Sequence, residues 1–193
     1  AAGPGIYCTK PSQGRVNLMA AEDGLLKIQV DRLNQINNLN NLVFATLHNN
    51  RVVKKDQMLG GTRIVPLAID AVVLEQAENL CREPDPLMQV LPFKPLWVAV
   101  VTTGSEVNSG RIKDGFARIM RQKINPFGGR WMGQVIVPDD PDLIANEIQN
   151  FVAEGAGLIL VTGGMSVDAD DATPHGIRRA ASNVVSYGAP VLP

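Results

Sequence analysis

Apolar runs of strand length recur along the second half of the chain, from about Pro95 onward. The first of them, residues 96–101, is unbroken, which is typical of a strand buried on both faces. Three shorter runs predict further strands at 134–137, 158–161 and 184–187.

Helical spacings fill the intervals between these runs. They predict helices over 112–123, 141–152 and 173–180. In the first, Phe116 falls on the apolar face and is predicted to be core. Before the second, Asp140 precedes Pro141, which is the order of an N-cap followed by proline at the first helical position.

Regular alternation of strands and helices predicts an α/β fold for this half, with helices on both sides of a doubly wound, mostly parallel sheet in three αβα layers. In such sheets, ligands bind beyond the carboxyl ends of the strands. The residues that follow Val101, Val137 and Val161 are therefore the first candidates for a site.

The first half, residues 1–92, has shorter and less regular elements and predicts a smaller α+β domain, with the second domain at 93–193. The patterns favour strands at 24–31, 43–47 and 63–69, and helices at 32–42 and 71–81. A linker rich in proline and charge follows at 82–86. Because the chain stops on a predicted strand, we expect it to be a fragment of a longer protein, truncated at its C-terminus.

Composition narrows the classes of function. The 193 residues have a net charge of −1, which argues against strong binding to nucleic acid or to an anionic membrane. No apolar run approaches the roughly 20 residues that span a bilayer. Cys8 and Cys81 stand alone, and His48 and His175 lie too far apart in sequence to suggest a classical zinc site. A cytoplasmic protein with reduced thiols is expected.

Glycines, hydroxyls and carboxylates gather at the predicted strand ends. The loops are 102–106, 138–140 and 162–171. Glycines there let backbone N–H groups approach an anion, and the hydroxyls add donors. The carboxylates among them favour either Mg²⁺-dependent phosphoanhydride chemistry or transfer of an oxyanion. Each motif also has a plainer interpretation, since Gly-Gly after a strand is most often a tight turn and Asp140 is a cap.

Four motifs occur in order: Thr-Thr-Gly-Ser-Glu, Ile-Lys-Asp, Val-Pro-Asp-Asp, and Thr-Gly-Gly-Met-Ser-Val followed by Asp-x-Thr-Pro. Together they resemble the molybdopterin-binding domain of molybdenum-cofactor biosynthesis proteins, over about residues 96–187. The loop forms look closer to the molybdopterin molybdenumtransferase branch. The first half is similar, more weakly, to the accessory domain of bacterial proteins related to that branch.

The resemblance implies roles for individual residues. It implies catalytic roles for Glu106, Asp139 and Asp171. It implies ligand-binding roles for Thr103, Gly104, Ser105, Asp114, Gly163, Gly164, Met165 and Ser166. The expected cofactor is Mg²⁺, without assigned ligands, and the expected partners are molybdopterin or adenylyl-molybdopterin and molybdate. The family is commonly oligomeric, which makes a homo-oligomer an expectation here as well.

Two departures from the family pattern keep alternatives open. The helix start reads Asp114-Gly115-Phe116, without the family's serine and asparagine, and Asp168 replaces a usual glycine. One alternative is a carrier or regulator that binds molybdopterin without turnover. The other is a nucleotide-sugar pyrophosphatase of the competence/damage-inducible type, which has a similar glycine and aspartate loop.

Overall fold

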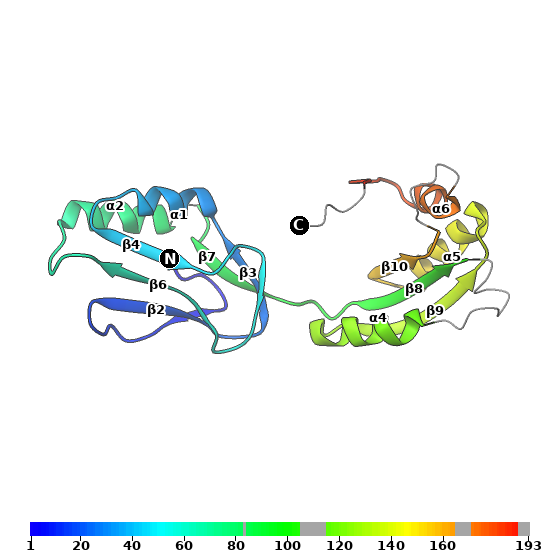
Figure 1. The fold of residues 1–193 in the computed structure, drawn as a ribbon, viewed down its shortest axis with the longest axis horizontal. Coiled ribbons are helices and arrows are strands. Elements are labelled where there is room, and N and C mark those ends of the chain that lie inside the picture. Colours follow the sequence, from blue (N-terminus) through cyan, green and yellow to red (C-terminus); the bar gives the residue numbers. More distant parts are fainter. Residues whose placement is uncertain (83, 105–114, 165–170, 189–193) are drawn as a thin grey trace. The chain divides into compact units, whose positions relative to one another are not determined.

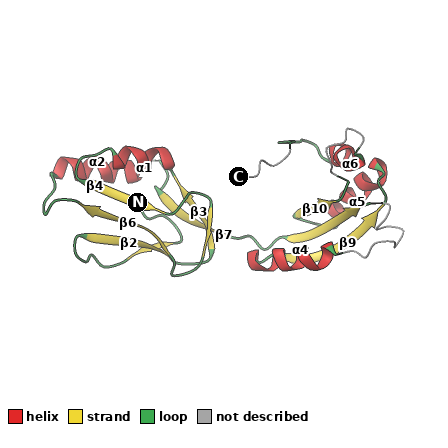
Figure 2. Cartoon of the chain, in the orientation of Figure 1, coloured by secondary structure: helices red, strands yellow, loops and turns green. Residues whose placement is uncertain are grey.

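The chain folds into two units that both combine helices and strands. The computed structural model describes residues 1–82, 84–104, 115–164 and 171–188. The chain divides into two compact units, Ala1–Phe93 and Lys94–Pro193. Across the described residues the fold is mixed α/β (Figures 1 and 2).

The first unit contains two sheets. The larger has the order β1-β2-β6-β4, formed by Ile6–Cys8, Arg15–Ala20, Met58–Ile64 and Leu42–Thr46. The smaller has the order β5-β3-β7, formed by Arg51–Val53, Gly24–Ile28 and Met88–Pro92. Every strand pair in both sheets is antiparallel.

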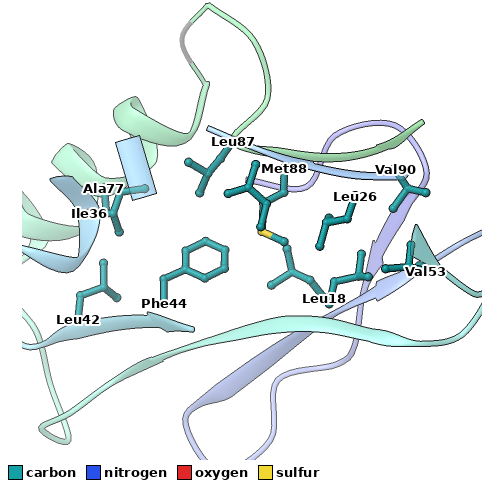
Figure 3. Packing of buried hydrophobic residues seen from close by; sticks show 13 residues of the cluster. Leu18, Leu26, Ile36, Leu42, Phe44, Val53, Ala77, Leu87, Met88 and Val90 are labelled. Carbon is teal, nitrogen blue, oxygen red and sulfur yellow. The ribbon is translucent and has the colours of Figure 1, made fainter. Parts of the chain in front are cut away.

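Two helices cover one side of this arrangement, α1 (Val30–Asn37) and α2 (Ala71–Arg82) (Figure 1). Figure 3 shows the core that results, in which Phe44 of β4, Met88 of β7 and Leu26 of β3 converge. Leu26 and Met88 are fully buried, and Phe44 is nearly so. The apolar residues that alternate along the strands therefore meet the helices and define the inner face of the larger sheet.

Three predicted boundaries in the first unit were wrong. The strand predicted at 24–31 ends at Ile28, because α1 begins at Val30. The strand predicted at 63–69 ends at Ile64, because Pro66 lacks an N–H for a sheet ladder, and Leu67 beyond it is fully exposed. The helix predicted at 32–42 ends at Asn37, whose amide side chain donates to and accepts from the backbone of Phe44. The helix at 71–81 is confirmed as α2.

In the second unit, three strands lie side by side in the order β10-β8-β9. They are Leu158–Thr162, Trp97–Thr103 and Arg130–Val137, and both pairings are parallel. The predictions of strands at 96–101, 134–137 and 158–161 are confirmed, although β9 begins four residues earlier than the pattern indicated.

Helices lie beside both faces of these strands. Ile144 of α5 (Pro141–Ala153) packs with Val101 and Val137 in one buried cluster. Ile124 of α4 (Phe116–Ile124) lies on the other face, where its side chain and Val98 both border Gly129. After α4 comes a short 3₁₀ turn, η1 (Asn125–Phe127), and after β10 comes α6 (Ala172–Ala180), which packs on α5. Among the described residues, no helix is long and apolar enough to cross a bilayer.

Two predictions in this unit were wrong. Residues 184–187 do not form a strand, because no described strand pairs with them, and Val185 is 93% exposed. Phe116 is not core, since it stands in the first turn of α4 and remains 39% exposed. Within α4, only Ile124 is buried, so its apolar face is covered mainly near its C-terminal end.

Candidate functional site

The carboxyl ends of the three parallel strands meet at one edge, as the sequence predicted. Thr103 lies opposite Val137, and Thr102 lies opposite Thr162 in the neighbouring pair. We call this edge, together with residues 104, 138–140, 163–164 and 171–174, the carboxyl rim. Parallel strands that end in register bring their following loops together, and this is the usual ligand position in such sheets.

A buried hydrogen bond ties the first strand to the last helix at this rim. The hydroxyl groups of Thr103 on β8 and Thr173 in the first turn of α6 are 2.8 Å apart. Thr103 is 3% exposed and Thr173 is fully buried. Because buried hydroxyls need partners, the bond fixes the position of the α6 N-terminus relative to the strand end.

Gly163 and Gly164 pass so close to this pair that no larger residue fits. Gly163 has φ +92°, and a Cβ placed on it would lie 2.1 Å from the carbonyl oxygen of Thr103. Gly164 has φ +50°, and its Cβ would lie 2.6 Å from Thr173 Oγ1 and 3.0 Å from Asp139 Oδ1. Both glycines are therefore required by sterics and by left-handed backbone geometry.

Three aspartates near the rim have different surroundings. Asp140 caps α5, since its Oδ1 accepts from the backbone N–H groups of Asp142 at 2.8 Å and Leu143 at 3.0 Å. The plainer interpretation of Asp140 as an N-cap is thus confirmed. Asp139 turns Oδ1 toward Gly164, as the distance above shows.

Asp171 is the N-cap residue of α6, yet its side chain makes no capping hydrogen bond. Its Oδ2 is buried and has no hydrogen-bond partner among the residues that the structure describes. A buried carboxylate oxygen without a partner is costly, because desolvation is not offset by any bond. This atom is the clearest indication of a missing polar partner at the rim.

A second polar group lies on the opposite face of the same strands. The amide of Gln134 donates to Thr102 Oγ1 at 2.8 Å, and the hydroxyl of Thr162 donates to the same atom at 3.3 Å. Thr102 is fully buried. The bonds cross-link β9, β8 and β10 just before the loops begin, which stiffens the base of the rim.

The structure brings together six of the residues that the sequence singled out. They are Thr103, Gly104, Asp139, Gly163, Gly164 and Asp171. Among them, the Gly104 N–H donates to the Val137 carbonyl at 3.1 Å. The other candidates lie outside the described residues: Ser105, Glu106, Asp114, Met165 and Ser166.

The sequence did not single out Thr173 as a site residue, although it stands in the Thr-Pro motif. Its signal was a small polar residue two positions after the rim aspartate. Within the described part of the chain, no three His, Cys, Asp or Glu side chains stand close enough to hold a metal. The rim instead offers hydroxyl and backbone donors for an anion, with two carboxylates beside them.

Comparisons with known proteins place this rim in a recognised domain. Residues 99–192 match the family model described as a probable molybdopterin binding domain. A protein of Archaeoglobus fulgidus is 36% identical over 81 residues, covering 42% of this chain and 35% of that one.

A CinA-like protein of Citrifermentans bemidjiense is 32% identical over 95 residues, covering 49% of this chain and 23% of that one. The molybdopterin molybdenumtransferase of Synechococcus elongatus is 25% identical over 111 residues, covering 51% of this chain and 28% of that one. The chain thus matches about a third or less of the length of these relatives.

Among solved structures, the tungsten cofactor synthesizing protein MoaB from Pyrococcus furiosus is similar to the chain with a TM-score of 0.41 and 22% identity. The similarity covers 44% of this chain and 52% of that one.

Proposed function

We propose, from the match of residues 99–192 to the model of a probable molybdopterin binding domain, that the protein binds molybdopterin at the carboxyl rim and acts in molybdenum-cofactor assembly. The bare backbone at Gly163 and Gly164 and the hydroxyls of Thr103 and Thr173 support binding of the phosphate end of the ligand. Ser105, Asp114, Met165 and Ser166 complete the proposed ligand-binding set. For the whole domain we propose the doubly wound, three-layer arrangement with a mostly parallel sheet.

One observation supports this proposal most directly: Oδ2 of Asp171 is buried and has no partner in the part of the chain that the structure describes. A structural aspartate at a helix start ordinarily accepts from the helix N–H groups, as Asp140 does on α5. Asp171 lacks that bond, and its buried Oδ2 has no partner within the described ranges. Strain or cost of this kind is typical of functional sites, where a ligand or ion supplies the missing interaction.

We also propose Mg²⁺ as the cofactor of this rim. Asp139 and Asp171 would hold it, with Glu106 as a third carboxylate, because carboxylate oxygens are the donors that Mg²⁺ prefers. When bound, the ion would neutralise phosphate charge beside the carboxylates. The residues of the chain hold and orient the phosphate through the glycine backbone and the threonine hydroxyls.

The finer proposal is a molybdenumtransferase-like reaction, in which adenylylated molybdopterin and molybdate are the substrates. The assignments of Glu106, Asp139 and Asp171 as its catalytic residues are part of this proposal. We place the protein in the cytoplasm and propose a homo-oligomer, with residues 1–92 as the accessory domain.

A second candidate function rests on the relatives. The CinA-like protein of Citrifermentans bemidjiense matches about as much of the chain as the molybdenumtransferase does, 49% against 51%, at 32% against 25% identity. Hydrolysis of a nucleotide-sugar pyrophosphate at the same rim is therefore the alternative. A molybdopterin carrier without turnover is supported by the sequence Asp114-Gly115-Phe116, which lacks the serine and asparagine typical of the family.

The variant Asp171→Asn tests whether molybdopterin binds at the carboxyl rim. Removing a carboxylate whose Oδ2 is buried without a partner among the described residues should leave the thermal stability of the unliganded protein equal or higher, while molybdopterin binding weakens at least tenfold. Binding is measured by calorimetry with purified molybdopterin and Mg²⁺, and Glu154→Gln, an exposed carboxylate at the α5 C-cap, is the matched control.

Unchanged molybdopterin affinity in Asp171→Asn would refute the proposed site. The same preparation separates the candidate reactions: turnover of adenylyl-molybdopterin with molybdate supports the transferase, and hydrolysis of ADP-ribose supports the pyrophosphatase. Tight binding without either turnover identifies the carrier.

A further inference from the structure

A cationic cavity lies in the first unit, which the proposed function leaves without a role. It has a volume of about 450 Å³. Its lining is polar throughout and includes Lys10, Ser12, Gln13, Arg15, Asn17 and Arg63. We call it the arginine pocket. None of its lining residues is acidic.

Strand register places the two arginines of this pocket side by side. Arg15 of β2 and Arg63 of β6 are directly opposite each other in the antiparallel ladder. Like charges at opposed positions repel and destabilise a strand pair. No ion pair joins either arginine or Lys10 to a carboxylate among the residues that the structure describes. An anion bound between the arginines would remove this repulsion.

The turn beside the pocket is held in an unfavourable backbone conformation. Ser12 and Arg15 exchange backbone hydrogen bonds of 3.0 and 2.9 Å around a two-residue loop. In that loop Gln13 has φ +50° and Gly14 has φ +70°, a combination that normally favours asparagine or glycine at the first position. Gln13 adopts this conformation at a cost and lines the pocket.

An apolar cavity of about 380 Å³ continues from the pocket and shares Arg15, Asn17 and Arg63 with it. Its floor lies over Gly60 and Gly61 of β6, where the sheet has no side chains. The apolar wall includes Val43 and Met58, which are 43% and 56% exposed.

Side chains alternate between the two faces of the sheet along β6, and this alternation shows that both cavities lie on one face of the larger sheet. Thr62 belongs with Phe44 and Ile36 to the lining of an inner cavity, so its neighbours Gly61 and Arg63 point to the outer face. Helices α1 and α2 cover the other side (Figures 1 and 2). A ligand can therefore reach the outer face without displacing a helix.

We propose that the arginine pocket and its apolar extension form a binding site for a small phosphate monoester whose organic part is flat and apolar. The phosphate lies between Arg15 and Arg63, where guanidinium groups bind phosphate through paired N–H donors. The flat group lies on the bare backbone of Gly60 and Gly61. This site belongs to the first unit and does not depend on the function proposed for the second.

Phenyl phosphate is the probe, and amide resonances of the full 193-residue protein are the readout, because they locate binding. Phenyl phosphate should shift the amides of residues 9–17 and 60–63, and inorganic phosphate should shift the same set with at least fivefold lower affinity. Arg63→Gln should weaken the affinity for both by at least tenfold. Arg51→Gln on β5, an exposed arginine that lines neither cavity, is the matched control and should bind as the unaltered protein does.

The variant Gly61→Leu tests the flat part of the ligand separately. A side chain at position 61 begins 3.0 Å from Asn17 Oδ1 and fills the apolar extension. It should abolish the advantage of phenyl phosphate over inorganic phosphate while leaving the weaker affinity in place. Melting curves confirm that each variant is folded. Absence of shifts at 9–17 and 60–63, or an equal loss in Arg51→Gln and Arg63→Gln, would overturn the proposal.

Discussion

The hydroxyl pair of Thr103 and Thr173 predicts a strongly non-additive pair of mutations. Replacing either residue by valine keeps the shape but leaves the other hydroxyl buried without its partner across the 2.8 Å contact. An orphaned buried hydroxyl costs about 1–3 kcal/mol, so each single variant should be destabilised by that amount. The double variant removes both hydroxyls, leaves no orphan, and should lose clearly less than the sum of the two singles.

The chain provides a specific probe for this cycle. Both of its tryptophans, Trp97 and Trp131, lie in the second unit, and the first unit has none. Urea unfolding followed by tryptophan fluorescence therefore reports on the unit that contains the bond. Each single variant leaves one buried hydroxyl without a partner. We therefore expect a coupling free energy between the two mutations of about 1 kcal/mol or more, within the range for residues in direct contact.

Additive behaviour would refute the reasoning. If the double variant loses the sum of the single losses within about 0.5 kcal/mol, the two hydroxyls do not depend on each other. Thr162→Val is the control within the same unit, because its hydroxyl donates to Thr102 on the other face of the strands. It should show no coupling to Thr173→Val.

Three further results are expected. Asp140→Ala removes the α5 cap and should lower the free energy of unfolding of the second unit by about 0.5–2 kcal/mol, by the same fluorescence assay. Gly163→Ala should cost about 2–4 kcal/mol, since left-handed backbone strain adds to overpacking against the Thr103 carbonyl. A hydrogen bond from the Lys54 ammonium, aided by a backbone N–H, holds the pKa of Asp23 below its usual value, and carboxyl NMR titration should show this. Because the folded pKa is lowered, the stabilisation is complete above the usual aspartate pKa and is lost as pH falls through the lowered one.

Each of these has a matched control. Asp142→Asn keeps the cap and should leave α5 intact, and equal losses in the two variants would contradict the capping role of Asp140. Gly155, which also has positive φ but has nothing within 4 Å of its Cβ, separates strain from overpacking: Gly155→Ala should cost less than Gly163→Ala. Lys54→Ala should raise the pKa of Asp23, and an unchanged titration would contradict the assigned cause.

Periodic elements of the second unit could be predicted from the sequence because local pattern and final environment agree there. The run at 96–101 is apolar throughout and becomes β8, buried from Val98 to Thr103. Asp140-Pro141 begins α5 as predicted, because capping depends on neighbouring residues alone. Elements that depend on a distant partner were less accessible to prediction. Residues 184–187 have strand composition but no described neighbour to pair with.

The same distinction applies to the rim. Gly163 and Gly164 could be singled out because glycine after a strand has a local meaning. The contact of Thr103 with Thr173 could not be predicted, because it joins residues 70 positions apart. The sequence does not distinguish a buried threonine from an exposed one. The antiparallel pair of Arg15 and Arg63 was hidden for the same reason, since register is set by the whole sheet.

Gly176 illustrates how far the requirements of a site extend from the ligand. It is buried in α6, and a Cβ on it would lie 2.7 Å from Ile144 of α5, so the two helices touch at backbone distance. Any larger residue would push α6 outward and carry Asp171 and Thr173 away from the strand ends. Gly176 is therefore needed for the geometry of the rim, although it is not one of the rim residues. What Gly176 provides is the close packing of α6 on α5, not a chemical group.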